Sequence, residues 1–570
     1  IEAAASALLA TGENIIYSAP FKTQSIEPVM QAVMDTIATQ QPKIGQVATA
    51  KQALASKSIT IADSKLSSFL TGTGQSSAAV AGATAKHDPL IYFGGMQLPY
   101  FLDTPTAANC GADLASKGTC DALTSHWVTD TAGTALSPAN RTPLKKSDHA
   151  VQVFISIPDE SNLPSGITKP ATGWPVVLYV HGITSYKENG AAIAGNLAAQ
   201  GLTMVAIDLP LHGSRSIDMN ADGVYEISTT TSSSSTSPYK NGSSLVFGNL
   251  GSLRTVRDNL RQSISDILSL RGALSFTPAY TDANSAVISA LTLDPNSVTM
   301  MGVSLGSIIG TGALGASDIY DGTTITGGTD VAASALEFDA AALTVGGTQS
   351  AAVMAYSGEF GPTVRAAFEK NTAFLTAVGA KVPASSGGPL SVAQLGGLRD
   401  GDATQKATFK AIVDAAYPTF ITTFVTAAQQ AVDAGDAIAW AQKVKSDTPV
   451  LVTQVVGNGG TNLADQTVPN STADKGFPLG GTTPLIATLG LTSYNTGDTT
   501  GGFVTGATLK AATQFQLGKH TSLLDPSHVE GITQDAGAAY AATVEMQTQV
   551  ISFLKSNGKA LQITDTNVAK

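Results

Sequence analysis

One serine in this chain stands in a context that makes serine a nucleophile. Ser304 occupies the centre of Gly302-Val303-Ser304-Leu305-Gly306, a Gly-x-Ser-x-Gly pentapeptide. The β-branched and methionine residues before it predict a strand, and the small residues after it predict the start of a helix. Such a corner exposes the serine hydroxyl, and the helix N-terminus favours developing negative charge. We predict that Ser304 is the nucleophile of an acyl-transfer reaction.

Acyl transfer also needs two N–H donors for the oxyanion of its transition state. The backbone N–H of Leu305, directly after the nucleophile, is the first predicted donor. The second is expected in the loop after an earlier strand, where His181-Gly182-Ile183-Thr184 follows an apolar run, and we assign it to Ile183. His181 is interpreted as shaping this turn rather than as the base.

The acid that orients the base is expected after the nucleophile, at the end of a later strand. Asp465 meets both conditions, because it lies in a Gly/Asn-rich loop just past the apolar run 449–456. Asp447 precedes that run and would lie at the wrong edge of the sheet. Asp208 also ends an apolar run, but it comes before the nucleophile, and we expect it to order the loop 209–213.

Two histidines follow Asp465 in the sequence. His520 comes after the short predicted strand 513–517, in the loop position expected for a base, and we assign that role to it. His528 is interpreted as a surface or substrate-contacting residue. In this scheme His520 takes the proton of Ser304 and Asp465 fixes the tautomer of the imidazole, so no metal or organic cofactor is needed.

The segments that must position these residues indicate an α/β architecture. Residues 151–157 alternate like a strand, and continuous apolar runs follow at 175–180 and 203–208, which is typical of strands covered on both faces. An Ala-rich helical segment, 190–200, between the two runs completes a strand–helix–strand unit. We therefore predict an α/β-hydrolase fold for residues 151–570.

Two further regions complete the predicted organisation. A chain of 570 residues is too long for one ordinary core, and residues 1–150 carry no catalytic motif, so they are predicted to form a separate N-terminal accessory domain. The stretch from about 346 to 446 is mostly helical in pattern and lies between two predicted strands. An insertion at this point is expected to form a helical cap or lid.

Composition narrows the possible partners. The net charge of −11 argues against a nucleic-acid partner and against electrostatic docking on anionic lipid. No stretch reaches the roughly 18 uninterrupted apolar residues of a membrane helix, so no transmembrane segment is predicted. Cys110 and Cys120 are the only cysteines. Their closeness predicts one disulfide made in an oxidising compartment, with two free thiols as the alternative.

Several motifs together resemble the extracellular lipases of the Pla-1/cef type, a bacterial virulence-factor lipase family related to the Vibrio surface lysophospholipase. Besides the Ser304 pentapeptide and the 181–184 loop, they are Leu98-Pro99-Tyr100-Phe101-Leu102, Gly173-Trp174-Pro175-Val176-Val177, Ile207-Asp208-Leu209-Pro210-Leu211-His212-Gly213 and Val256-Arg257-Asp258-Asn259-Leu260-Arg261-Gln262.

The resemblance extends from about residue 90 onward. It implies a bacterial enzyme, secreted or on the outer-membrane surface, that cleaves lipid acyl esters as a lipase, phospholipase A1 or lysophospholipase. The sequence begins at Ile1 without a signal peptide, so a signal or lipid anchor is expected to lie outside it.

Two other functions remain open at this point. A general or polyester-degrading esterase would use the same residues, because fold does not set substrate. A non-catalytic surface-binding protein could also be built on a hydrolase scaffold. The presence of serine, aspartate and histidine at matching strand ends favours an enzyme.

Overall fold

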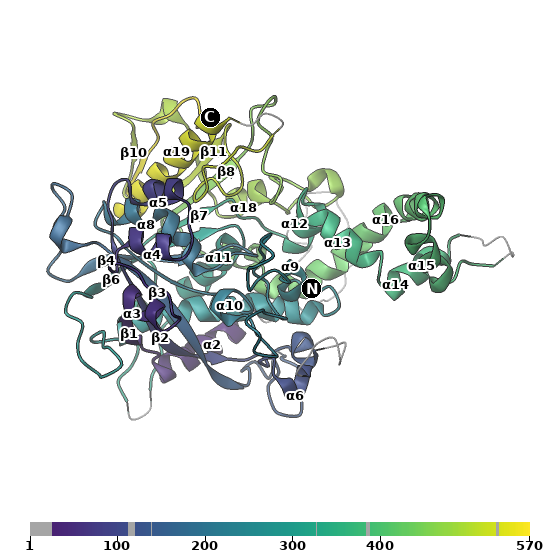
Figure 1. Cartoon of the computed structure of the whole chain (residues 1–570), viewed down its shortest axis with the longest axis horizontal. Helices are drawn as coiled ribbons and strands as arrows, with labels where there is room; N and C mark the ends of the chain where they lie inside the picture. The colour runs from purple at the N-terminus through teal and green to yellow at the C-terminus, as the bar shows by residue number, and fades with distance from the viewer. Residues whose placement is uncertain (1–25, 112–119, 138, 326–327, 383–387, 532–534) are drawn as a thin grey trace, which may run out of the picture.

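The computed structural model describes residues 26–111, 120–137, 139–325, 328–382, 388–531 and 535–570 (Figure 1). Ten strands in these ranges form one sheet, in the order β1-β2-β3-β5-β4-β6-β7-β8-β11-β9, and β10 pairs with β12 separately. The strands are β1 Gly45–Thr49, β2 Leu90–Tyr100, β3 Ser147–Ile157, β4 Trp174–Val180, β5 Thr203–Ile207, β6 Leu293–Val303, β7 Ala341–Thr344, β8 Val450–Val455, β9 Thr492–Tyr494, β10 Phe503–Thr505, β11 Lys510–Phe515 and β12 Ala560–Gln562.

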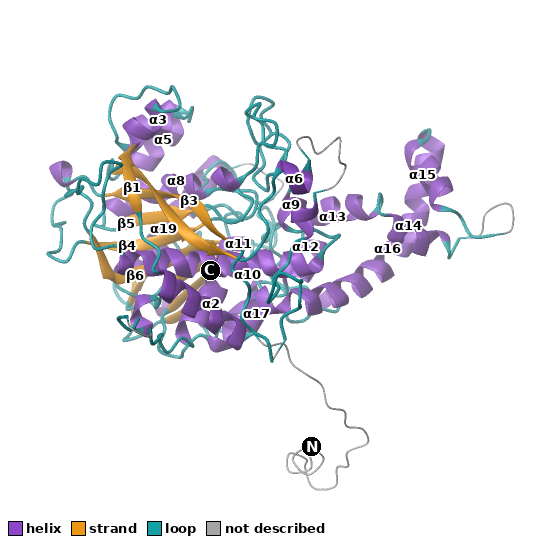
Figure 2. Cartoon of the chain, turned by 90° about the horizontal axis from the view of Figure 1, so that it is seen from below, coloured by secondary structure: helices purple, strands orange, loops and turns teal. Residues whose placement is uncertain are grey.

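The helices cover both faces of this sheet and form an insertion between β7 and β8 (Figure 2). They are α2 Glu27–Gln40, α3 Ala50–Ala55, α4 Leu66–Gly72, α5 Ser77–Thr84, α6 Ala107–Cys110, α8 Ala191–Ala198, α9 Ser244–Phe247, α10 Leu253–Phe276, α11 Leu305–Asp318, α12 Ser350–Tyr356, α13 Phe360–Phe368, α14 Thr372–Gly379, α15 Val392–Asp400, α16 Ala403–Val432, α17 Ala437–Trp440, α18 Thr482–Thr488 and α19 Ala536–Lys555.

The central strands are parallel and buried on both faces. β5, β4, β6, β7, β8, β11 and β9 run parallel to one another, whereas β3, β2 and β1 extend the sheet from β5 by antiparallel pairing. Side chains of β4 alternate between two cores: Val176 and Leu178 pack with α10 and α11, and Val177 and Tyr179 pack with α8 and α19. This two-sided burial explains the continuous apolar run of β4. The predicted α/β-hydrolase fold is confirmed.

The N-terminal region differs from the prediction of a separate domain over residues 1–150. The predicted boundary falls inside β3, and β2 pairs with β3 along its whole length, from Leu90 with Ile157 to Tyr100 with Ser147. Helices of this region also contribute to the two cores that cover the sheet. The described N-terminal residues, 26–150, therefore share the sheet of the remaining chain; residues 1–25 lie outside the described ranges.

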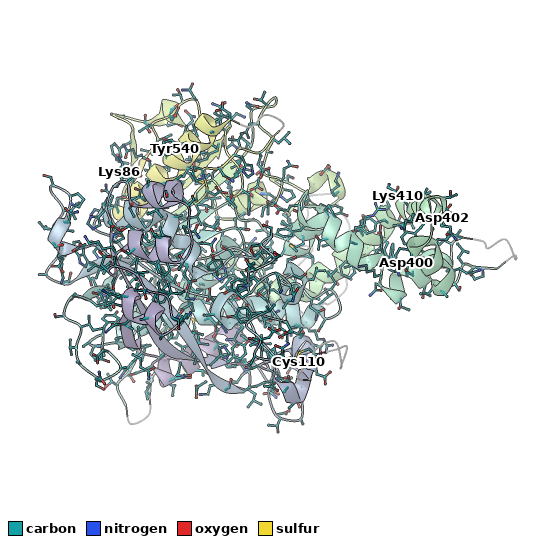
Figure 3. The ribbon with its side chains drawn as sticks, viewed as in Figure 1. Lys86, Cys110, Asp400, Asp402, Lys410 and Tyr540 are labelled. Atoms are coloured by element: carbon teal, nitrogen blue, oxygen red, sulfur yellow. A yellow bond between two sulfur atoms is a disulfide. The ribbon has the colours of Figure 1, made fainter. Side chains whose placement is uncertain are left out.

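The insertion between β7 and β8 is helical, as predicted, and most of it projects from the body as an arm of α13 to α16 (Figures 1 and 2). The labelled charged side chains of Asp400, Asp402 and Lys410 lie at the far part of this arm (Figure 3). The arm has a core of its own, in which Phe374 contacts Phe420 with ring centroids 4.6 Å apart. The aromatic residues of the insertion thus pack mainly against one another.

One helix among the described residues, Ala403–Gly435, is long and apolar enough to cross a membrane by length and composition, with a mean hydropathy of 1.3. Polar residues interrupt its apolar run, so it lacks 18 uninterrupted apolar residues, and the absence of a transmembrane segment stays a prediction. In the fold, Phe409, Val413, Ile421 and Val425 of this helix face the core of the arm. One side of the helix therefore packs against protein.

The predicted disulfide between Cys110 and Cys120 is present. Both cysteines pack with Leu211 and Ile227 in a small apolar cluster, and this packing places the disulfide-linked end of α6 against the loops that follow β5. Residues 112–119, which the disulfide encloses, lie outside the described ranges.

Candidate active site

Ser304 lies at a sharp turn between β6 and α11. Its backbone has φ 58° and ψ −121°, a conformation that L-residues rarely adopt and that the surrounding structure must hold in place. The flanking glycines make the turn possible: a Cβ on Gly302 would overlap the carbonyl oxygen of Gly306, and a Cβ on Gly306 would overlap that of Val180. The serine is therefore held where strand and helix make their closest approach.

The loop after β4 lies directly against the serine. A Cβ placed on Gly182 would be 3.2 Å from the Cβ of Ser304, a tight contact that the glycine avoids. Leu305 is the first residue of α11, and its N–H has no preceding helical carbonyl to bond. Ile183 lines the same cavity as Ser304. Leu305 directly follows the nucleophile and Gly182 packs against it, whereas the oxyanion role of the Leu305 and Ile183 N–H groups stays a prediction.

Asp465 and His520 meet at the carboxyl ends of β8 and β11. His520 Nδ1 is 2.7 Å from Asp465 Oδ2, and both side chains are buried. The other oxygen of Asp465 accepts hydrogen bonds from the backbone N–H groups of Thr467 and Val468, at 2.8 and 2.9 Å. These bonds leave the carboxylate fixed with one oxygen aimed at the imidazole.

The environment of His520 favours its protonated form. Burial acts to lower the pKa of His520, but the carboxylates of Asp465, Glu359 and Glu530 together outweigh it, and the net effect raises the pKa above its ordinary value. Among the described residues, Nε2 of this ring has no hydrogen-bond partner although it is buried. Ser304 and His520 both line one cavity of about 1280 Å³.

Backbone and amide contacts join the loop that carries Asp465 to the loop that carries His520. Asn462 Oδ1 accepts from the N–H of Gly518 at 3.0 Å. Glu530 bridges both loops, because its N–H donates to Gly518 O and its carbonyl accepts from Leu463 N. Sequence reasoning missed Asn462, since its only sequence signal was its place in a Gly/Asn-rich loop.

His181 shapes the loop after β4 and is not placed to act as a base. Its Nδ1 lies 2.8 Å from the carbonyl of Gly182, and its Nε2 accepts from the N–H of Leu209 at 3.0 Å. Because Nε2 accepts a hydrogen bond it carries no proton, and burial favours this neutral ring by lowering the pKa of His181. Both ring nitrogens are used within the protein.

Asp208 orders the loop that follows β5, as expected from its position. Its carboxylate accepts from Lys187 Nζ at 2.8 Å and from the N–H and hydroxyl of Ser214 at 2.8 and 2.7 Å. Burial acts to raise the pKa of Asp208, yet the Lys187 ammonium lowers it well below the ordinary carboxyl value. Asp208 is therefore a buried anion with a structural role.

The remaining alternatives lie away from the serine. Asp447 is exposed and precedes β8, at the opposite end from Asp465. His528 is also exposed, and its Nδ1 lies 3.0 Å from Lys519 Nζ and 3.0 Å from Ser527 Oγ. It belongs to a surface cluster rather than to the Asp465–His520 pair.

No family model and no curated protein matches the chain, so the resemblance to Pla-1/cef lipases has no further support. Similar solved structures include an acylaminoacyl peptidase of Pyrococcus horikoshii, at 12% identity and TM-score 0.32, where the match covers 72% of this chain and 40% of the peptidase. An open-form lipase matches at 12% identity and TM-score 0.28, over 72% of this chain and 95% of the lipase. Brefeldin A esterase, a bacterial homologue of human hormone-sensitive lipase, matches at 11% identity and TM-score 0.29, over 72% of this chain and 74% of the esterase. At such low similarity, substrate and reaction must be argued from the residues of this chain.

Proposed function

We propose that the chain is a serine hydrolase that cleaves carboxylic esters through an acyl-enzyme on Ser304. The observation that carries the proposal is the 2.7 Å contact of His520 with Asp465, in a pair that shares one cavity with a serine in a strained strand-to-helix turn. A buried imidazole with one nitrogen on a carboxylate and the other free is the arrangement a general base requires.

In the proposed reaction, His520 Nε2 takes the proton of Ser304 as the hydroxyl oxygen attacks the ester carbonyl. The N–H groups of Leu305 and Ile183 stabilise the oxyanion, and Asp465 stabilises the imidazolium. The imidazolium then protonates the departing alcohol. Water attacks the acyl-enzyme with His520 again as base, which releases the carboxylic acid and restores Ser304.

The cavity supports a lipid ester as the substrate. Its volume of about 1280 Å³ is large for a small-molecule site. It is lined by three of the large hydrophobic side chains that are exposed on the described surface: Phe503, Tyr540 and Val544 (Figure 3 labels Tyr540). An acyl chain attached to Ser304 and extending into the cavity would contact this apolar surface. The disulfide supports an extracellular or cell-surface location for such an enzyme.

The deciding experiment replaces the nucleophile. Ser304→Ala should lower the hydrolysis of p-nitrophenyl esters by at least about a thousandfold, with the melting temperature nearly unchanged. Retained turnover in the purified variant would contradict the proposal.

A substrate series then fixes the specificity. Wild-type protein is assayed on esters from acetyl to stearoyl, on phospholipids and lysophospholipids, on a soluble polyester oligomer, and on an aminoacyl amide. A lipid hydrolase should show its highest kcat/KM on long acyl chains. A maximum on the polyester or on short esters indicates the general esterase, and a maximum on the amide indicates a peptidase.

A further inference from the structure

A short segment at the root of the helical arm packs onto the loop that carries Asp465. The hydroxyl of Ser357 and the N–H of Glu359 both donate to the carbonyl of Gln466, each at 3.2 Å. Gly358 lies between them, where a Cβ would be 3.1 Å from the same carbonyl oxygen. The arm root and the Asp465 loop are therefore in direct contact.

From this contact a continuous series of hydrogen bonds leads to the imidazole. Thr467 Oγ1 donates to Glu359 Oε2 at 2.7 Å, and Thr467 N donates to Asp465 Oδ1 at 2.8 Å. Asp465 Oδ2 in turn lies 2.7 Å from His520 Nδ1. Thr467 is thus held on one side by the arm and holds the carboxylate on the other.

We propose that Glu359 is a positioning residue, which fixes Thr467 and through it the orientation of Asp465 toward His520. This proposal rests on the proposed function of Ser304, Asp465 and His520. In this proposal the arm root acts on catalysis indirectly, through Thr467 and Asp465.

The charge of Glu359 adds a second effect to the positional one. Three carboxylates act on His520: Asp465, Glu359 and Glu530. Each favours the imidazolium that forms when His520 takes a proton. Glu359 is exposed, so solvent and salt screen its charge, and the positional effect should be the larger.

The test measures how fast Ser304 reacts with a fluorophosphonate, followed by mass spectrometry of the intact protein across a pH series. This rate depends on the basicity and orientation of His520 but not on the identity of the natural substrate. The variants are Glu359→Gln, Glu359→Ala, Thr467→Val and the double variant Glu359→Ala/Thr467→Val. Glu369→Gln is the matched control, because it removes the same charge from the arm within the Arg365–Glu369 pair.

Glu359→Gln keeps an acceptor for Thr467, so its rate on the alkaline plateau should stay within about twofold of wild type. Its acid limb should move to lower pH, and the shift should shrink at high salt. Glu359→Ala and Thr467→Val should each lower the plateau about fivefold, and the double variant should be no slower than either, since both break the same bond.

The proposal is overturned if every variant shows the same plateau rate and the same acid limb of the pH–rate profile as the wild-type protein. If Glu359→Ala unfolds, Thr467→Val decides through its plateau rate, because it removes the same bond from the other side. A wild-type protein that is not labelled at Ser304 would refute the proposed function instead. The positioning role would then be read from the low-field proton resonance of His520 Nδ1–H, which must shift in Glu359→Ala for the proposal to stand.

Discussion

At the scale of single residues, the proposed chemistry depends on the protonation of His520. Only the neutral ring can accept the proton of Ser304, and the net effect of its surroundings raises the pKa of His520 above its ordinary 6.5. Activity is therefore lost as pH falls through this raised pKa. The stabilising effect of the pair on folding has the opposite sign, because it is complete below the unfolded-state pKa and is lost as pH rises through the folded-state pKa.

The first prediction at this scale concerns the pH profile. The acid limb of kcat/KM for a neutral ester should give an apparent pKa above 6.5. Asp465→Asn removes the carboxylate that raises it, and kcat should fall by roughly ten-thousandfold, as expected when the imidazole loses its orienting carboxylate. A wild-type midpoint below the ordinary histidine value would contradict the assignment of His520 as base.

Some residues of the candidate site could be predicted from local sequence patterns, and others are placed by contacts between distant segments. Ser304, Asp465 and His520 could be predicted because each must follow a strand, and strands leave a local pattern. Glu359 and Asn462 could not, because their roles come from contacts between segments distant in sequence. The hydrophobic periodicity of the sequence does not predict that the arm root packs onto the Asp465 loop.

At the scale of elements, the turn at Ser304 depends on the close approach of α11 to β4. We expect Gly306→Ala to lower the free energy of unfolding by about 1–3 kcal/mol, because the added methyl would overlap the Val180 carbonyl. Gly397→Ala in α15 is the control: its Cβ would meet nothing within 4 Å, and alanine favours a helix, so stability should rise slightly. Urea denaturation measures the free energy of unfolding of both variants. Equal changes in the two would show that the close approach of α11 to β4 does not require glycine at position 306.

The elements themselves were predictable in the parallel half of the sheet and less so elsewhere. Continuous apolar runs identified β4, β5 and β8, because both faces of these strands are buried. The antiparallel pairing of β2 with β3 joins strands far apart in sequence, and loop composition alone does not reveal such a partner. The predicted domain boundary was misplaced for this reason.

At the scale of the whole molecule, the arm and the body have separate cores. Phe374 is fully buried in the arm, so Phe374→Ala should destabilise the arm by about 3–5 kcal/mol. Hydrogen exchange should rise in α14 to α16, while turnover of a small soluble ester should stay within about twofold, since Phe374 does not line the Ser304 cavity. Thr419→Ala, on the exposed side of α16, is the control, and a parallel loss of turnover would show that the body needs the intact arm.

The order of the strands along the chain determines when the candidate site can be completed during synthesis and folding. Ser304 follows β6, but Asp465 and His520 follow β8 and β11, near the end of the chain. While the chain is being synthesised, the serine turn can form long before its base exists, and the protein at that stage has no means to activate the hydroxyl. The proposed hydrolysis can begin only after β11 joins β8 and brings His520 to Asp465. We therefore expect that activity recovers during refolding only after the C-terminal strands have docked, even when the serine turn has already formed.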